Sequence, residues 1–152
     1  MSTGVRILVT GAAGMVGRKF CERIAREGRL GDAPVDELIM SDIVAPAPLA
    51  APFKVVSRAD DIADPATSEA FVALEPDVVV HLGAIVSGEA EANFEKGYAI
   101  NLDGSRLLFE AIRKRHMASA YTPRVVAASS IAVFGAPFPE IIGDEFFHQP
   151  LT

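Results

Sequence analysis

The sequence of 152 residues lacks tryptophan and has a single cysteine, Cys21. One cysteine cannot form an intramolecular disulfide or complete a thiolate metal cluster, which favours a reducing, cytoplasmic setting. The chain also lacks any apolar stretch of about 18 residues, the length that a membrane-spanning helix needs. We therefore expect no membrane partner.

Positive charge is scarce, because 14 Lys and Arg face 20 Asp and Glu, for a formal net charge of −6. Binding to nucleic acid requires clustered positive charge, so we expect no nucleic-acid partner. The three histidines, at positions 81, 116 and 148, show no metal-ligand spacing, and no metal site is expected. A hydrophobic fraction of 50% in a chain of this length describes one globular domain.

Short apolar runs alternate with helical periods along most of the chain. The run 5–10 is continuously apolar, as in a strand buried on both faces of a parallel sheet. The expected elements are strands at 5–10, 37–42, 53–56, 78–81 and 125–128, and helices at 14–27, 65–75 and 89–115. This order predicts an α/β fold, a doubly wound parallel sheet in three αβα layers. The remaining segment, 131–152, has no sustained period and is expected to be a loop over a site.

Three glycines at a spacing of three, Gly11, Gly14 and Gly17, lie directly after a predicted strand and open a predicted helix. The first allows a sharp turn, the second lets backbone N–H groups approach a pyrophosphate, and the third lets helix pack on strand. The turn, with Ala13, Met15 and Val16, is therefore predicted to bind a dinucleotide; an ordinary loop is the alternative. A Walker phosphate loop is excluded, because Gly17 is followed by Arg-Lys-Phe and not by Lys-Ser/Thr.

An acidic residue, Asp42, closes the second predicted strand 25 residues after Gly17. In dinucleotide-binding folds an acid about 20 residues beyond the glycines binds the ribose 2′-hydroxyl. Its carboxylate would repel a 2′-phosphate, which favours NAD over NADP, although Arg18 could reverse that preference. The alternative is a strand-end aspartate that caps a turn.

These residues and several later segments resemble the extended short-chain dehydrogenase/reductase family, which includes NAD-dependent epimerases and dehydratases. Asp61-Ile62 is similar to the family's pair that holds adenine. The segment His81-Leu82-Gly83-Ala84 resembles its H-x-A-[AG] strand end beneath the cofactor, and Asn101 to Ser105 resembles its N-x-x-G-T motif, with Gly83 and Ser105 as mild departures. The resemblance implies a Rossmann-like fold, NAD as cofactor, contacts from Ile43 and Asn101, and a homodimer formed in part by the helix 89–115.

The segment Ser129 to Gly135 resembles the family's S-S-x-x-V-[YF]-G motif, which implies a catalytic role for Ser130. In the family a Tyr-x-x-x-Lys pair transfers the proton. Here Tyr98 and Tyr121 are followed four residues later by Leu102 and Val125. The resemblance places the pair just beyond Thr152, so we expect the chain to be truncated before it.

The segment 131–152 resembles most the group of family members that oxidise D-erythronate, a sugar acid. The resemblance thus implies the NAD-binding N-terminal part of an oxidoreductase that acts on a secondary alcohol. Residues 1–130 would form the NAD-binding domain, and residues 131–152 the start of the active-site region, with the C-terminal substrate domain absent. A nucleotide-sugar epimerase or dehydratase and a catalytically silent NAD-binding module remain open.

The small-molecule substrate is expected near Ile85, Val86 and Ser87, which follow the predicted strand 78–81. Ligands of such sheets lie at the carboxyl ends of the strands. A serine hydrolase built on Ser130, Asp144 and His148 is disfavoured, because the chain has no Gly-x-Ser-x-Gly elbow.

Overall fold

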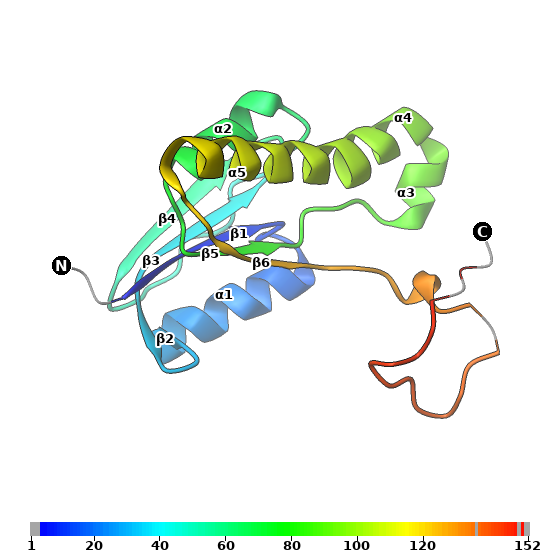
Figure 1. Cartoon of the computed structure of the whole chain (residues 1–152). Helices are drawn as coiled ribbons and strands as arrows, with labels where there is room; N and C mark the ends of the chain where they lie inside the picture. Colours follow the sequence, from blue (N-terminus) through cyan, green and yellow to red (C-terminus); the bar gives the residue numbers. More distant parts are fainter. Residues whose placement is uncertain (1–3, 136, 149, 151–152) are drawn as a thin grey trace.

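A six-stranded sheet with helices on both faces makes up most of the protein (Figure 1). The computed structural model describes residues 4–135, 137–148 and 150. The elements are β1 (Val5–Thr10), α1 (Met15–Glu27), β2 (Arg29–Leu30), β3 (Ala33–Asp42), β4 (Lys54–Ala59), α2 (Pro65–Ala73), β5 (Val78–His81), α3 (Ser87–Ala92), α4 (Phe94–Gly97), the π-helix η1 (Tyr98–Gly104), α5 (Ser105–Ser119), β6 (Arg124–Ala127) and the 3-10 turn η2 (Ile131–Val133).

The five longer strands are parallel and lie in the order β4-β3-β1-β5-β6, while β2 pairs antiparallel with the start of β3. The chain steps outward from β1 through β3 to β4, then crosses back to β5 on the other side of β1. The strand order therefore reverses between β1 and β5, which is where doubly wound sheets bind ligands. The predicted Rossmann-like, doubly wound parallel sheet is confirmed.

Alternate residues of β1 face the two helix layers. Ile7 and Val9 pack with Cys21 and Ile24 of α1, whereas Leu8 packs on the other side. That second cluster comprises Leu8, Ile39, Phe71, Val72, Val79, Leu108 and Ala111, from β1, β3, α2, β5 and α5. Both faces of the sheet are covered, so the chain folds in the predicted αβα layers, with α1 on one side and α2 and α5 on the other (Figure 1).

The ends of two helices are set by local sequence. Gly28 takes a left-handed conformation, φ 68°, and its N–H donates to the Ile24 carbonyl at 2.9 Å, which ends α1 as predicted. Asp64 accepts a hydrogen bond from the Ala66 N–H at 2.9 Å and caps α2, with Pro65 in the first turn.

The prediction of one helix over 89–115 is wrong, because that stretch is divided into α3, α4, η1 and α5. Asn93 leaves the helical region, with φ −139° and ψ 88°, and its Oδ1 accepts from the Lys96 N–H to start α4. The predicted apolar face is also divided. Phe94, Tyr98 and Leu102 are more than half exposed, and Leu108 is fully buried.

Several strands also differ from the sequence prediction. The second predicted strand, 37–42, is β3 and begins four residues earlier, at Ala33. The third predicted strand, 53–56, is β4 and continues to Ala59. The two-residue strand β2 was not predicted, because its pairing with Ala33 and Pro34 depends on the tight turn at Gly31, φ 62°, rather than on any apolar period.

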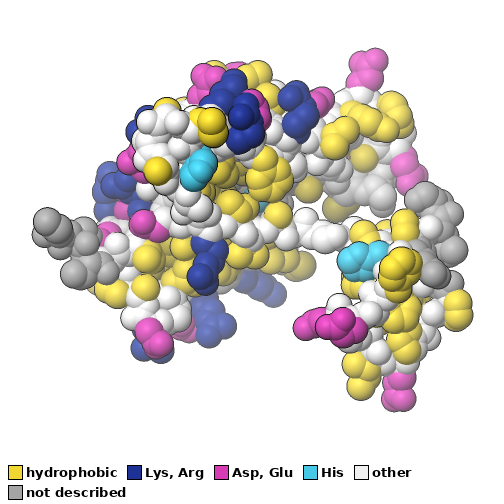
Figure 2. Space-filling view, viewed as in Figure 1, with side chains coloured by type: hydrophobic (Ala, Val, Ile, Leu, Met, Phe, Trp, Pro, Cys, Tyr) yellow, Lys and Arg dark blue, Asp and Glu magenta, His cyan; other side chains and the backbone are white. Residues whose placement is uncertain are grey.

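After β6 the described residues form no further strand or long helix. Phe134 packs against Phe146 and His148 within this segment, with ring centroids 5.9 and 5.2 Å apart. It leaves the sheet at the carboxyl edge (Figure 1) and carries exposed hydrophobic side chains (Figure 2), Phe147 among them. No helix in the described part of the chain is long and apolar enough to cross a membrane.

Two buried titratable groups lie on elements next to β1. Burial raises the pKa of the Cys21 thiol to about 12, so the thiol stays protonated at neutral pH. His81, at the end of β5, is only 5% exposed, and burial lowers its pKa below the ordinary 6.5.

We expect Gly17→Ala to destabilise the fold. A Cβ at Gly17 would overlap the Gly11 carbonyl oxygen and lie 2.8 Å from Ala12 Cα, both backbone atoms. Urea unfolding should show a loss of about 1–3 kcal/mol, typical of overpacking. The matched change Gly88→Ala, in α3, meets nothing within 4 Å and should cost no stability. Equal effects of the two changes would contradict this account.

His81 makes stability depend on pH in a defined direction. Its pKa is lower in the folded than in the unfolded chain, so below pH 6.5 the unfolded state binds more protons. The free energy of unfolding should therefore fall as pH drops from about 7 to about 5. His81→Gln should remove this component, whereas His116→Gln, an exposed histidine, should retain it. The same pH slope in wild type and His81→Gln would show that another group is responsible.

Candidate functional site

A cavity of about 340 Å³ opens at the carboxyl ends of β1, β3, β4 and β5. It lies where the strand order reverses, the place at which sheets of this class bind ligands. Its lining residues are Thr10, Gly11, Ser41, Asp42, Ile43, Asp60, Asp61, Ile62, Ala63, Phe71, Gly83, Ala84, Ile85, Glu89, Lys96, Ala99 and Ile100.

The turn after β1 passes very close to the end of β5. Gly11 has φ 70°, and a Cβ there would lie 2.6 Å from the Leu82 carbonyl carbon. The turn is closed by the Gly14 N–H, which donates to the Gly11 carbonyl at 3.2 Å, and is tied to β3 by the Ala12 N–H, which donates to the Ser41 carbonyl at 3.1 Å. Only glycine fits at Gly11, as the sequence predicted for the sharp turn.

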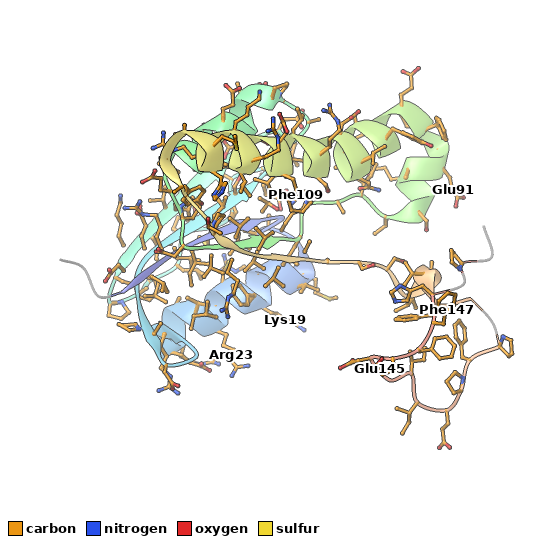
Figure 3. All side chains as sticks on the ribbon, in the orientation of Figure 1. Lys19, Arg23, Glu91, Phe109, Glu145 and Phe147 are labelled. Atoms are coloured by element: carbon orange, nitrogen blue, oxygen red, sulfur yellow. The ribbon has the colours of Figure 1, made fainter. Side chains whose placement is uncertain are left out.

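The turn leads into the N-terminus of α1, whose N-cap is Gly14. Within the described residues no side chain caps this helix, and its first turn holds no acidic residue. The first N–H groups of a helix lack partners inside it and carry the positive end of its dipole, so an anion can bind there. Figure 3 shows Lys19 and Arg23 on the side of α1 away from the sheet.

Asp42 joins this turn to the loop after β3. Its Oδ2 accepts a hydrogen bond from the Ala13 N–H at 2.9 Å, and its Oδ1 accepts from the Ile43 N–H at 2.7 Å. Two backbone donors therefore hold the carboxylate at the cavity wall. A carboxylate accepts about four hydrogen bonds, which leaves acceptor capacity for a ligand.

Arg18 is held beside the same loop. Its Nε donates to Glu22 at 2.6 Å, and its Nη1 donates to the Ala47 carbonyl at 2.6 Å. Two of the three guanidinium nitrogens are thus engaged by the protein.

The far wall of the cavity carries two adjacent acids, of which sequence analysis identified only Asp61. The Asp61 Oδ1 accepts from the Ala63 N–H at 2.9 Å and shapes the turn before α2. Asp60 accepts two hydrogen bonds from Arg58, at 2.9 and 2.8 Å, and one from Ser41 at 2.8 Å. Burial of Asp60 opposes ionisation, but the hydrogen bonds from Arg58 and Ser41 outweigh it and hold the pKa of this carboxyl below its ordinary value.

The loop after β5 is fixed by a side chain of η1. The Ile85 N–H donates to Asn101 Oδ1 at 2.9 Å, and Asn101 Nδ2 donates to the Ile85 carbonyl at 3.0 Å. Gly104 brings the end of η1 against Ile62, because a Cβ there would lie 3.0 Å from Ile62 Cγ2. Asn101 thus acts on the cavity by holding its wall.

The structure brings eight of the predicted site residues together in the cavity lining: Gly11, Asp42, Ile43, Asp61, Ile62, Gly83, Ala84 and Ile85. Other predicted residues lie beside it: Ala13, Gly14, Met15, Val16 and Gly17 form the turn and the start of α1, and Leu82 packs against the core on the α1 side. Val86 is exposed. Ser87 and Asn101 line a separate shallow groove together with Phe94 and Tyr98.

Ser130 is not among the residues that line the cavity. It is exposed beyond the end of β6, and its Oγ accepts from the Ala132 N–H at 3.2 Å to start η2. Tyr121 is also engaged structurally, because its hydroxyl donates to the Pro76 carbonyl at 2.6 Å, and burial raises its pKa.

Sequence reasoning missed Glu89 and Lys96, which form an ion pair across the α3–α4 break and line the cavity. The sequence analysis placed both residues in one continuous helix, whereas the chain breaks between them at Asn93. Asp60 could have been identified, since it follows β4 as directly as Asp42 closes β3. Among the described residues no group of three or more His, Cys, Asp or Glu is arranged to hold a metal ion.

Comparisons with known proteins agree with this geometry. The sequence model of the NAD dependent epimerase/dehydratase family matches residues 7–151. D-erythronate dehydrogenase of Cupriavidus necator is 35% identical over 151 residues, which cover 96% of this chain and 45% of that protein. The chain thus spans less than half the length of this relative.

Similar solved structures agree with this family match. The nucleoside-diphosphate-sugar epimerase from Agrobacterium tumefaciens is 52% identical with a TM-score of 0.89, over 97% of this chain and 44% of that chain. L-threonine 3-dehydrogenase from Trypanosoma brucei is 30% identical with a TM-score of 0.71, over 97% of this chain and 44% of that chain. Because the family match covers nearly every residue and the fold superimposes on these structures, the chain belongs to the NAD dependent epimerase/dehydratase family.

Proposed function

We propose that this chain binds NAD across the carboxyl edge of its sheet. One observation carries the proposal: the three segments that resemble the family's cofactor motifs meet at a single cavity, where the strand order reverses. They contribute Gly11, Asp42 and Asp61 from the ends of three different strands.

Each part of the dinucleotide has a matching partner. The uncapped start of α1, with Gly14, Met15, Val16 and Gly17, suits the pyrophosphate. The Asp42 carboxylate would accept hydrogen bonds from the ribose hydroxyls, because the Ala13 and Ile43 N–H groups leave part of its capacity free. The adenine would lie near Ile43, Asp61 and Ile62, and the nicotinamide end toward the loop Leu82 to Ile85 that Asn101 holds.

The arrangement favours NAD over NADP. Asp42 would repel a 2′-phosphate, and Arg18, the cation that could attract one, is already bound by Glu22 and the Ala47 carbonyl. A switch to NADP would have to remove the carboxylate and turn the remaining Arg18 donors toward the 2′-phosphate.

When bound, NAD supplies the hydride acceptor for oxidation of a secondary alcohol. We propose that Ile85, Val86 and Ser87 contact that small-molecule substrate and that Ser130 positions its reacting hydroxyl. All four residues follow the carboxyl ends of β5 and β6, where substrates of such sheets bind.

We propose a sugar acid such as D-erythronate as substrate, which the name of the 35% identical relative supports. A nucleotide-sugar epimerase is the second candidate, because the relative titled a nucleoside-diphosphate-sugar epimerase is 52% identical to this chain. The two differ in an observable way, since a dehydrogenase releases NADH, whereas an epimerase returns the hydride to its substrate.

Within this chain we propose that residues 1–130 form the NAD-binding unit and that residues 131–152 begin the active-site region. The exposed side chains of Phe94, Tyr98 and Leu102, on α4 and η1, are the surface we propose for a homodimer. Figure 3 shows Phe109 below α5, on its sheet-facing side, so Phe109 is not part of this surface.

Asp42→Ala should weaken NAD binding about tenfold or more by removing hydrogen bonds to the ribose. It should also bring NADP affinity closer to NAD affinity, because the repulsive charge is gone. Isothermal titration with both cofactors measures the two effects. Structural damage alone would weaken both equally. Asp32→Ala, an exposed aspartate at the opposite end of β3, serves as the control and should change neither affinity. Unchanged NAD affinity in Asp42→Ala would make the cofactor assignment wrong.

The 152-residue chain should bind NAD without reducing it in the presence of D-erythronate. Oxidation of an alcohol requires a base for the hydroxyl proton, and no tyrosine in this sequence has a lysine four residues later. NADH absorbance, read in a sample whose NAD binding has been measured, tests this. Turnover by this chain would contradict this prediction, because another group would then have to accept the proton. It would also exclude the hypothesis of a catalytically silent NAD-binding module.

A further inference from the structure

Behind the cavity a chain of hydrogen bonds connects β1, β5 and α5. The Gly83 N–H donates to Thr10 Oγ1 at 3.2 Å, and Thr10 Oγ1 lies 2.7 Å from His81 Nδ1. On the other side of the ring, His81 Nε2 lies 2.9 Å from Ser105 Oγ, which donates to the Asn101 carbonyl at 3.2 Å. Four hydrogen bonds thus run from the loop after β5 to the middle of η1.

The two ends of this chain of hydrogen bonds, together with a neutral His81 ring, determine the direction of every bond in it. A carbonyl only accepts, so the one proton of Ser105 goes to Asn101, and Ser105 Oγ must accept from His81 Nε2–H. In a neutral ring Nδ1 is then an acceptor, and it takes the hydroxyl proton of Thr10. Thr10 in turn accepts from the Gly83 N–H, which only donates. All four bonds therefore point one way, and the neutral ring carries its proton on Nε2 rather than on Nδ1.

The series of hydrogen bonds closes into a ring through the side chain of Asn101, whose amide binds both the N–H and the carbonyl of Ile85. The cavity wall from Gly83 to Ile85 is therefore fixed at both ends, at Gly83 through Thr10 and at Ile85 through Asn101. Asn101 lies inside the π-helix η1, the rarer helical form that frequently marks functional sites.

We propose that His81 is a positioning residue that fixes the wall of the cofactor cavity by this directional ring of hydrogen bonds. It does not line the cavity, so it acts on a ligand only through Thr10, Gly83 and Ser105. The role for NAD rests on the proposed function, whereas the tautomer rests only on these contacts and on a neutral ring.

The first test needs no cofactor. The ¹⁵N shifts of the His81 ring in the unligated chain at neutral pH should show a protonated Nε2 and a bare Nδ1. A protonated Nδ1, or a doubly protonated ring, would overturn the proposal. The amide signals of Gly83 and Ile85 in Ser105→Ala should also move relative to wild type, because the ring is then open.

The second test measures NAD affinity and thermal stability side by side. Ser105→Ala should weaken NAD binding roughly five- to tenfold, the effect of about one lost hydrogen bond. Ser105→Thr keeps the hydroxyl and should restore affinity to within about twofold. The matched control is Ser68→Ala, a buried serine on α2 whose Oγ has no partner in the described part of the chain; it should leave affinity unchanged.

The outcomes separate this proposal from the proposed function. A Ser105→Ala variant that melts earlier but binds NAD as tightly as wild type would overturn the positioning role. Failure of Ser105→Thr to rescue affinity would do the same, since the hydroxyl would then not be the cause. Absence of NAD binding by wild type would instead overturn the proposed function, and the ring-nitrogen measurement would still decide the tautomer.

Discussion

The architecture of this site depends on the close approach of the β1–α1 turn to the end of β5. A side chain at Gly11 would meet the backbone of Leu82, and one at Gly17 would meet the backbone of the turn itself. Because both positions are glycine, α1 begins directly at the carboxyl edge, with its positive end beside the cavity. Asp42 then reaches the turn through the Ala13 N–H and joins the first βα unit to the next strand.

The opposite wall of the cavity, the loop after β5, is held mainly by hydrogen bonds. Besides the close approach of Gly11 to the Gly83 nitrogen, polar contacts hold Gly83 to Ile85: Thr10 bonds to buried His81 and accepts from the Gly83 N–H, and Asn101 binds Ile85 nearer the surface. Such contacts are directional, and leaving one partner unpaired in the interior is costly. The cavity therefore combines a turn set mainly by steric fit with a wall set mainly by hydrogen bonding, and both meet at the reversal of strand order between β1 and β5.

Local patterns predicted most of the sheet, because buried parallel strands are short continuous apolar runs and their helices carry explicit start and stop residues. Asp64 and Gly28 illustrate this, since each is recognisable from sequence alone and each performs the expected capping. The prediction of a single helix over 89–115 was wrong for a physical reason. Its apolar period is real, but Asn93 offers a side-chain cap that competes with helix continuation, and period counting does not weigh that competition. The ion pair of Glu89 and Lys96 spans that break.

Backbone amide shifts on titration with NAD test the central claim most directly. Binding at the carboxyl edge predicts that ¹⁵N–¹H signals move in four separate segments, residues 13–17, 42–43, 61–62 and 83–85, and that amides on the outer side of α1 stay in place. Shifts confined to the groove lined by Phe94, Tyr98 and Leu102, or no shifts at all, would contradict the account.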